Sequence, residues 1–378
     1  MNSPQNHNLF FKTLNIIEDN FDHEIEKYRE SSDTDPLFFL GDCLEVLKDI
    51  PDESVDTIIT SPPYWSQREY ENGGIGLENT LEDFFLNLLK ITHELKRVLK
   101  PTGSFWLNLG DVYKNKHLLG MPWRFAFKLI DEQNWVLRNE VIWNKVKGGM
   151  DNSKDKLGNV HETIFHFVKD PSKYFYSTDE IRSKPRQSKV VNGSIVSATG
   201  VSGVKYKRKI ELSTELTDEE KNNAFKALDE MLKQLKEGKY SDFRMVIRGA
   251  NRTTHSNSDK VSGRAKELLN KGFYFLKYHP EGSKPSDVWE ILPESSSKNK
   301  EHFAPYPIDL CRIPILATCP INGIILDPFV GTGTTCIAAK ILNRKSIGID
   351  ISKSYLETAK RRVLNEYNCR DFWIKNYS

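Results

Sequence analysis

Residues 60–65, with the sequence TSPPYW, place a hydroxyl group beside two prolines and two aromatic rings after the apolar run DTII. The Ser61 hydroxyl and the Pro62 carbonyl both accept hydrogen bonds, and the rings of Pro62 and Pro63 restrict the backbone that carries them. Two fixed acceptors suit the two protons of an amino group on a planar heterocycle. Tyr64 would then be the face on which the heterocycle stacks, with Trp65 as a second wall. The alternative is that both rings are core aromatics beside a loop.

A second candidate site is the glycine turn in ILDPFVGTGTTCIAA, residues 325–339. A strand is expected to end at Asp327, and Gly331 and Gly333 allow a sharp turn into a helix whose first N–H groups favour an anionic group. Asp350 ends the next expected strand, where a carboxylate accepts both hydroxyls of a ribose. The pattern predicts an adenosine-containing ligand. A purely structural strand–turn–helix is the alternative.

The sequence lacks the residues that several other kinds of binding site require. No lysine follows Gly333, as a P-loop requires, and Cys336 occupies the third glycine position of a dinucleotide fingerprint. The cysteines form no metal-ligand spacing, so no metal site is expected and small buried hydrophobes are the simpler interpretation. They are Cys43, Cys311, Cys319, Cys336 and Cys369.

The elements that must position these residues alternate between strand and helix. Strands are expected at 37–40, 56–60, 104–110, 136–145 and 162–169, and helices at 43–50, 80–99 and 122–134. A strand, glycine turn, helix and strand follow over 321–352, as in one βαβ unit. This order predicts a doubly wound α/β sheet.

Two segments depart from this order. Residues 10–30 predict one amphipathic helix. Residues 171–285 have weaker periodicity, with loops or short strands over 187–209 and one helix over 218–238, which predicts an insertion or separate lobe. Each half of the remaining chain would leave sheet edges exposed, so both are expected in one sheet with TSPPYW and DPFVGTG at its carboxyl edge.

Together these motifs resemble the amino-group DNA methyltransferases of the β group. IITSPPYW at 58–65 is similar to their catalytic motif, DPFVGTGTT at 327–335 to their S-adenosylmethionine motif, and EHFAPYPIDL at 301–310 to the segment before it. The segments GDCLEVLKDIPDESVDTIITSPPYW, RVLKPTGSFWLNLGD, VIWNK and SDVWEI strengthen the likeness. The resemblance implies a Rossmann-like S-adenosylmethionine-dependent methyltransferase sheet with a circularly permuted motif order and an inserted target-recognition region.

The resemblance also implies domains and residue roles. The domains would be an N-terminal helical extension at 1–36, a catalytic half at 37–170, a target-recognition insertion at 171–285 and a cofactor-binding half at 286–378. Ser61, Pro62, Pro63 and Tyr64 would be catalytic, acting on a base flipped out of the duplex. The S-adenosylmethionine contacts would be Asp42, His302, Phe303, Pro305, Pro307, Asp327, Phe329, Gly331, Gly333, Thr334, Thr335 and Asp350.

The target base is expected to be cytosine, methylated at N4, because serine at the first motif position resembles the cytosine-N4 enzymes. Adenine-N6 methylation stays open, since those enzymes more often carry Asp or Asn there. Cytosine-C5 methylation is disfavoured because its Pro-Cys pair is absent and only the reversed pair Cys319-Pro320 occurs. A catalytically silent DNA-binding protein, or a protein or RNA methyltransferase, is a further alternative.

The partner is expected to be double-stranded DNA, although the net charge is only +2. Residues 181–210 carry eight basic residues and no acid, and a second basic cluster spans 244–271. These two clusters could bind a polyanion such as DNA even though the net charge of the whole chain is small. Ordinary solvated loops are the alternative. The DNA contacts would be Lys205, Lys207, Arg208, Lys209, Arg248 and Arg252.

The cellular setting is expected to be the prokaryotic cytoplasm. No stretch reaches the roughly 18 apolar residues of a membrane span, and MNSPQNHNLF does not resemble a secretion signal. The family implies a cognate restriction endonuclease and, in many members, a homodimer.

Overall fold

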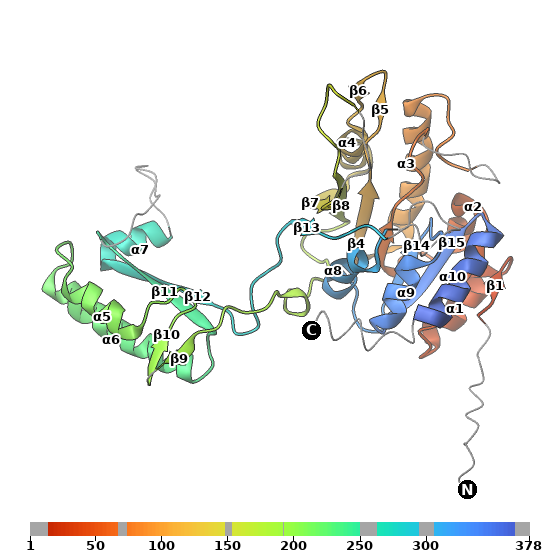
Figure 1. Ribbon diagram of the computed structural model, residues 1–378. Coiled ribbons are helices and arrows are strands. Elements are labelled where there is room, and N and C mark those ends of the chain that lie inside the picture. Colours follow the sequence, from red (N-terminus) through yellow and green to blue (C-terminus); the bar gives the residue numbers. More distant parts are fainter. Residues whose placement is uncertain are drawn as a thin grey trace, which may run out of the picture. The chain divides into compact units, whose positions relative to one another are not determined.

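The computed structural model describes residues 14–66, 74–147, 153–191, 193–249, 263–294 and 306–366. The chain forms two compact units (Figure 1). Unit 1 contains Met1–Ser177 and Ser286–Ser378, and unit 2 contains Thr178–Pro285. The lobe expected at 171–285 therefore begins seven residues later in the structure.

Unit 1 contains a nine-stranded sheet in the order β1-β2-β15-β14-β3-β4-β8-β7-β13 within the described residues. The strands from β1 to β4 in this order are parallel, whereas β8 runs antiparallel to both β4 and β7. Strand bounds are β1 Ile16–Ile17, β2 Leu37–Leu40, β3 Val55–Thr60, β4 Leu99–Leu109, β7 Val136–Asn144, β8 His161–Val168, β13 Val288–Glu290, β14 Ile324–Asp327 and β15 Lys345–Asp350. A small hairpin joins β5 Tyr113–Lys114 to β6 His117–Leu118.

The pairing of β14 with β3 joins the two predicted halves. Ile325 lies opposite Thr57, and Leu326 lies opposite Ile58, in parallel register. The predicted single α/β sheet is thus confirmed. The strands that precede the two motifs are neighbours in this sheet, although the cofactor motif comes far after the catalytic motif in the sequence.

Helices cover both faces of the sheet because successive strand residues point to opposite sides. Ile58 packs in one buried cluster with α1 Phe21–Glu30, α2 Cys43–Asp49, α3 Leu81–Val98 and α4 Met121–Gln133. Ile59 packs in another with α8 Ile308–Thr318 and α9 Thr334–Ile341, and α10 Lys353–Glu366 packs against α9 on that side.

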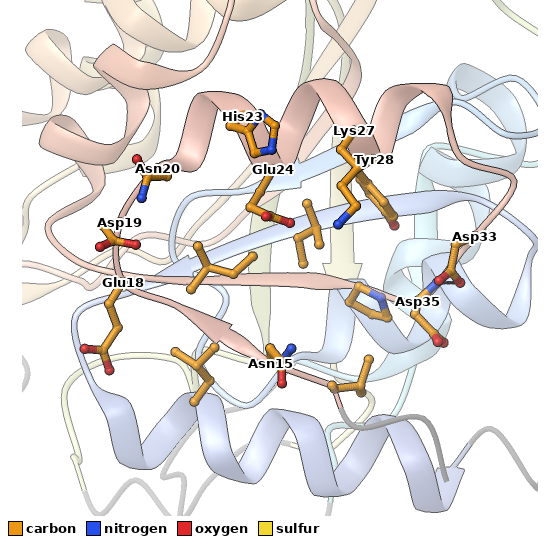
Figure 2. A pocket seen from close by; sticks show the side chains of 15 residues that line it. Asn15, Glu18, Asp19, Asn20, His23, Glu24, Lys27, Tyr28, Asp33 and Asp35 are labelled. Carbon is orange, nitrogen blue, oxygen red and sulfur yellow. Dashed lines mark hydrogen bonds between the residues drawn. The ribbon is translucent and has the colours of Figure 1, made fainter. Parts of the chain in front are cut away.

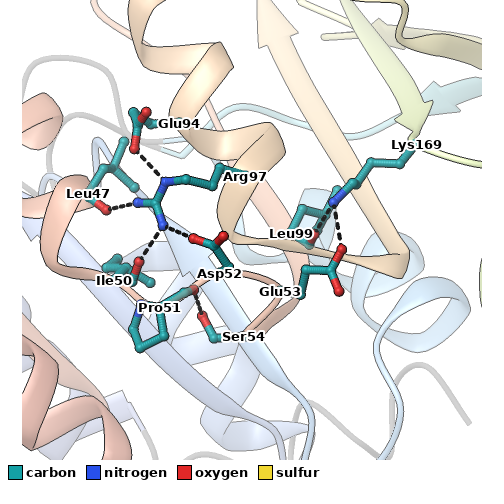
Figure 3. A network of polar contacts seen from close by, with 10 residues as sticks. All are labelled: Leu47, Ile50, Pro51, Asp52, Glu53, Ser54, Glu94, Arg97, Leu99 and Lys169. Carbon is teal, nitrogen blue, oxygen red and sulfur yellow. Dashed lines mark hydrogen bonds and ion pairs between the residues drawn. The ribbon is translucent and has the colours of Figure 1, made fainter.

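Arg97, near the end of α3, fixes the turn that leads into β3 (Figure 3). Its guanidinium donates to the carbonyls of Leu47 at 2.6 Å and Ile50 at 2.9 Å, and to the Asp52 carboxylate at 2.5 Å. Its Nε donates to Glu94 at 2.7 Å. These bonds hold the turn at the amino end of β3, the strand whose opposite end carries TSPPYW.

The N-terminal helix is shorter than predicted. Ile16 and Ile17 instead form β1, which pairs with β2, and α1 begins at Phe21 because Asn20 takes a left-handed conformation with φ of 53°. A hollow of about 780 Å³ lies beside this segment, lined by residues between 14 and 37 (Figure 2). Its lining includes none of the predicted site residues.

Unit 2 has a core of its own. The hairpin β9 Lys189–Val191 and β10 Ser194–Val196 precedes α5 Gly203–Glu211 and α6 Asp218–Lys236, and β11 Asp242–Ile247 pairs with β12 Phe273–Tyr278 across α7 Arg264–Lys271. The predicted helix at 218–238 is confirmed, with Thr217 and Glu220 forming a capping box. The expectation of loops or short strands up to 209 is wrong from 203 onward, because Ser202 caps α5 and Tyr206 and Ile210 bury its inner face.

In the part of the chain described, no helix is both long and apolar enough to cross a membrane.

His166 on β8 is a buried histidine that makes folding sensitive to acid. Its ring stacks on Trp106 with centroids 4.1 Å apart, and its Nε2 lies 2.9 Å from Ser104 Oγ. Burial, with a smaller effect of Arg138, lowers the pKa of His166 from 6.5 to about 3. Between pH 6.5 and about pH 3, this histidine binds a proton in the unfolded chain but not in the folded chain. The free energy of unfolding therefore falls as the pH drops through this range.

We expect His166→Gln to flatten the loss of stability between pH 6.5 and pH 4. Removing this titrating group should reduce the slope of the unfolding free energy by up to about 1.4 kcal/mol per pH unit. Urea unfolding at several pH values measures it. His93→Gln, at an exposed site on α3, is the matched control and should keep the wild-type slope. Equal slopes for His166→Gln and wild type would show that another group causes the acid sensitivity.

Candidate active site and DNA interface

The predicted site residues gather at the carboxyl edge of the sheet. Asp42 follows β2, Asp350 ends β15, Asp327 ends β14 and Ser61 follows β3. Because these four strands are adjacent and parallel, their carboxyl ends lie side by side. The glycine turn and TSPPYW therefore lie next to each other, as expected.

Asp350 is the carboxylate best placed for a ligand. Its Oδ2 accepts from Gly331 N at 2.9 Å and its Oδ1 from Ser352 N at 2.8 Å, which leaves the partly exposed carboxylate held at the glycine turn. Burial raises the pKa of Asp350 to about 6. Asp42 is exposed and caps α2 by accepting from Leu44 N at 2.9 Å.

Asp327 has a different role from the predicted ligand contact. It is 1% exposed, and Thr60 Oγ1 donates to it at 2.7 Å, Thr335 Oγ1 at 2.5 Å, Tyr306 OH at 3.0 Å and Phe329 N at 3.1 Å. Burial raises its pKa. With each oxygen accepting two internal donors, Asp327 ties the glycine turn to the end of β3 instead of facing a ligand.

The two threonines of the motif also point inward. Thr335 is buried against Asp327, and Thr334 accepts from Arg362 at 3.2 Å. Gly333 has a φ of 84°, and a side chain there would put its Cβ 2.8 Å from that of Ala359. These residues hold the turn against the helices. Phe329 remains partly exposed beside it.

Ser61 and Tyr64 belong to a polar cluster that spans three further strands. Tyr64 OH lies 3.3 Å from Ser61 Oγ and donates to Glu162 Oε2 at 2.8 Å. Asn108 Nδ2 is 2.8 Å from the same Glu162 oxygen, and Lys145 Nζ is 2.5 Å from the other. Burial, followed by the Glu162 charge, raises the pKa of Tyr64 well above 10. Ser61 and Tyr64 are partly exposed, as their proposed contacts require.

Trp65 does not serve as a second wall. It is 4% exposed, packs in the core cluster of α3, and donates from Nε1 to the Glu78 carbonyl at 2.8 Å. The alternative of a core aromatic is correct for this residue. The indole connects the end of TSPPYW to the core and to the Glu78 carbonyl.

Sequence reasoning missed Asn108, Lys145, Glu162 and Tyr306. For Asn108 the available signal was a polar residue within the apolar strand SFWLNLG, and Glu162 begins the apolar strand ETIFHFVK. The predicted residues His302, Phe303, Pro305 and Arg252 lie outside the described residues. Pro307 caps α8, immediately after Tyr306.

Three of the predicted DNA contacts form a basic stripe on α5. Lys205, Arg208 and Lys209 are exposed and line a hollow of about 470 Å³ in unit 2. Lys207 faces another side of the helix and pairs with Asp229 at 2.8 Å. Arg248 has a structural position instead, because its guanidinium donates to Glu220 at 2.6 Å and to backbone carbonyls within unit 2.

The fold and this edge define a methyltransferase, and comparison with known proteins identifies its family. A model of the DNA methylase family, named for N6 and N4 methylation, matches residues 55–361, and the chain belongs to this family. The protein is a methyltransferase that acts on DNA with S-adenosylmethionine as methyl donor. The carboxylate at the glycine turn and the partly exposed Phe329 suit this cofactor's ribose and apolar parts.

Relatives extend over most of the chain. The Type II methyltransferase M.SfiI of Streptomyces fimbriatus is 29% identical over 381 residues, which cover 85% of this chain and 89% of that protein. The Type II methyltransferase M.SmaI of Serratia marcescens is 26% identical, with coverage of 90% and 95%. The solved structure of PvuII DNA methyltransferase (cytosine-N4-specific) has the same fold, with a TM-score of 0.51, 16% identity and coverage of 89% and 92%.

Proposed function

We propose that the protein transfers a methyl group to the exocyclic N4 amino group of cytosine in double-stranded DNA. The observation that carries this proposal is the position of Ser61, at the carboxyl end of β3 and beside the Asp327–Thr60 bond that joins it to the glycine turn. Serine at this motif position favours cytosine, and the similarity to Type II methyltransferases supports a modification role.

In this proposal, the residues of TSPPY orient the amino group. Its lone pair is delocalised into the ring, and hydrogen bonds from its two protons to Ser61 Oγ and the Pro62 carbonyl favour a tetrahedral nitrogen. The lone pair is then localised on the nitrogen and directed toward the methyl group. S-adenosylmethionine supplies the electrophilic methyl group when bound, with Asp350 at its ribose and Asp42 near the adenine. The base leaves the duplex to reach this edge and stacks on Tyr64. One amino proton passes to water after transfer.

Mass spectrometry of nucleosides tests the target base. Plasmid DNA methylated by the purified protein is digested completely, with DNA treated by Ser61→Ala as the control. N4-methylcytosine is the expected product. N6-methyladenine alone would refute the cytosine assignment and favour the second candidate, adenine-N6 methylation, which the same family also covers. DNA binding without either product would favour a catalytically silent protein.

We also propose that unit 2 recognises the target and that its α5 stripe contacts the phosphates. Replacing Lys205, Arg208 and Lys209 with alanine should weaken DNA binding and reduce the slope of log K against log salt by up to about 3, roughly 0.9 per lost phosphate contact. Fluorescence anisotropy at several salt concentrations measures both. The triple variant Lys226, Lys233 and Lys236 to alanine, exposed on α6, removes the same charge and is the control. Equal slopes for the two triple variants would refute the α5 contact.

We propose a cognate restriction endonuclease as a partner, which the similarity to Type II methyltransferases supports. We infer that methylation by this protein blocks cleavage at one short recognition sequence. Mapping modified bases in DNA from expressing cells gives that sequence, and methylation spread over unrelated sites would contradict the inference. Sedimentation of the purified protein tests the proposed homodimer.

A further inference from the structure

A continuous line of side-chain hydrogen bonds leads from Ser61 across the sheet edge to Lys145. Ser61 Oγ lies 3.3 Å from Tyr64 OH, which lies 2.8 Å from Glu162 Oε2, and Glu162 Oε1 lies 2.5 Å from Lys145 Nζ. Each residue comes from a different part of the sheet: the end of β3, the loop after it, β8, and the end of β7. The Glu162 and Lys145 side chains are only 13% and 26% exposed.

The chemistry of these groups gives the line a direction. An ionised carboxylate only accepts hydrogen bonds, so Glu162 obliges the Tyr64 hydroxyl to donate to it. The Tyr64 oxygen then acts as an acceptor, and the side-chain donors beside it are Asn108 Nδ2 at 3.1 Å and the Ser61 hydroxyl at 3.3 Å. The hydrogen bonds within such a chain strengthen one another, which favours the same donor-to-acceptor direction at every step.

Asn108 is the second neighbour that affects how many lone pairs of the Ser61 oxygen stay available to a ligand. Its Nδ2 lies 3.3 Å from Ser61 Oγ, 3.1 Å from Tyr64 OH and 2.8 Å from Glu162 Oε2, so the amide also acts as a donor to this cluster. The amide has two protons for these three acceptors, and the shortest distance gives one of them to Glu162. The other proton is shared between the Tyr64 and Ser61 oxygens, while the Ser61 proton is directed to Tyr64. At least one Ser61 lone pair is therefore left for a proton from outside the cluster.

We propose that Glu162 is a positioning residue for methyl transfer, which acts through Tyr64 to make Ser61 Oγ an acceptor for the target amino group. Lys145 supplies the counter-charge that holds the Glu162 carboxylate in place. The inference rests on the proposed amino-group methylation and deepens it, because the orientation of Ser61 is the property on which that chemistry depends.

Single-turnover methylation rates of Glu162→Gln, Tyr64→Phe and the double variant test the proposal. Glutamine has nearly the same size, but its NH2 group donates and removes the fixed direction of the line. Each single variant should slow the methyl-transfer step roughly 10- to 100-fold, as small errors of position do. The double variant should be no slower than the slower single variant, since Glu162 acts through the Tyr64 hydroxyl. Glu162→Asp, which keeps the carboxylate, should restore part of the rate.

Controls separate positioning from folding. Cofactor affinity should match wild type in all these variants, each should be folded at the assay temperature, and Glu140→Gln on β7 should keep the wild-type rate. If Glu162→Gln fails to fold, Lys145→Met combined with Tyr64→Phe gives the same test of coupling. Wild-type rates for Glu162→Gln, or losses that multiply in the double variant, would overturn the proposal. If the wild-type protein forms no N-methylated base at all, the proposed function fails instead, so the two failures are distinguishable.

Discussion

Ser61→Ala is expected to lower the single-turnover methylation rate by on the order of 100-fold, comparable to removing one fixed group from an oxyanion hole. The variant loses the acceptor that orients the amino group, while the backbone carbonyl of Pro62 keeps its place. Cofactor binding should change little, because Asp350 and the glycine turn belong to other strands. Rapid-quench methylation measures the rate, and calorimetry with S-adenosylmethionine measures the affinity.

Ser66→Ala is the matched control for this prediction. It removes an exposed hydroxyl five residues further along the same loop and should keep the wild-type rate. A large loss of cofactor affinity in Ser61→Ala would indicate that Ser61 contacts the cofactor, and it would refute the assignment of Ser61 to the target amino group.

Asp350→Ala is expected to weaken S-adenosylmethionine binding roughly 10- to 100-fold, since hydrogen bonds to a charged group each contribute about 1.5–3 kcal/mol. The variant also leaves Gly331 N without its acceptor at the turn. The rate at saturating cofactor should fall much less than the affinity. An unchanged dissociation constant for S-adenosylmethionine would show that Asp350 does not contact the cofactor.

The pKa of about 6 gives the same residue a second readout. Ribose hydroxyls donate best to the ionised carboxylate, so cofactor affinity should be highest above pH 6 and fall as the pH drops below it, approaching tenfold per unit. Asp350→Asn should bind weakly and show no step between pH 7 and pH 5. A step that persists in this variant would assign the titration to another group.

The alternation of strands and helices could be predicted from the sequence because each element carries its own periodicity, and the two motifs could be found because their residue order is local. The internal role of Asp327 could not be predicted. It depends on Thr60 and Tyr306, which approach only through the pairing of β14 with β3 and the packing of α8.

Burial explains the remaining differences. Nothing in TSPPYW distinguishes a ring that faces a ligand from one that faces the core, and only the packing against α3 places Trp65 inside. Similarly, the composition of residues 187–209 suggests loops, whereas the contacts of Tyr206 and Ile210 with the unit 2 core stabilise α5. Arg248 was predicted from charge alone, and its partners, the Glu220 carboxylate and the Glu215 carbonyl, lie about 30 positions earlier in the chain.

The pairing of β14 with β3 also has a consequence for synthesis on the ribosome. Thr60 and Asp327, which hydrogen-bond in the finished protein, are 267 positions apart. β2 and β3 emerge early, and each must wait for β15 and β14 to fill the space between them. Contacts this distant in sequence make folding slow, and unpaired strand edges are prone to associate with other chains. The facing edges of β2 and β3 therefore stay unpaired until residues 324–350 have been translated, and association with other chains competes with folding during this interval.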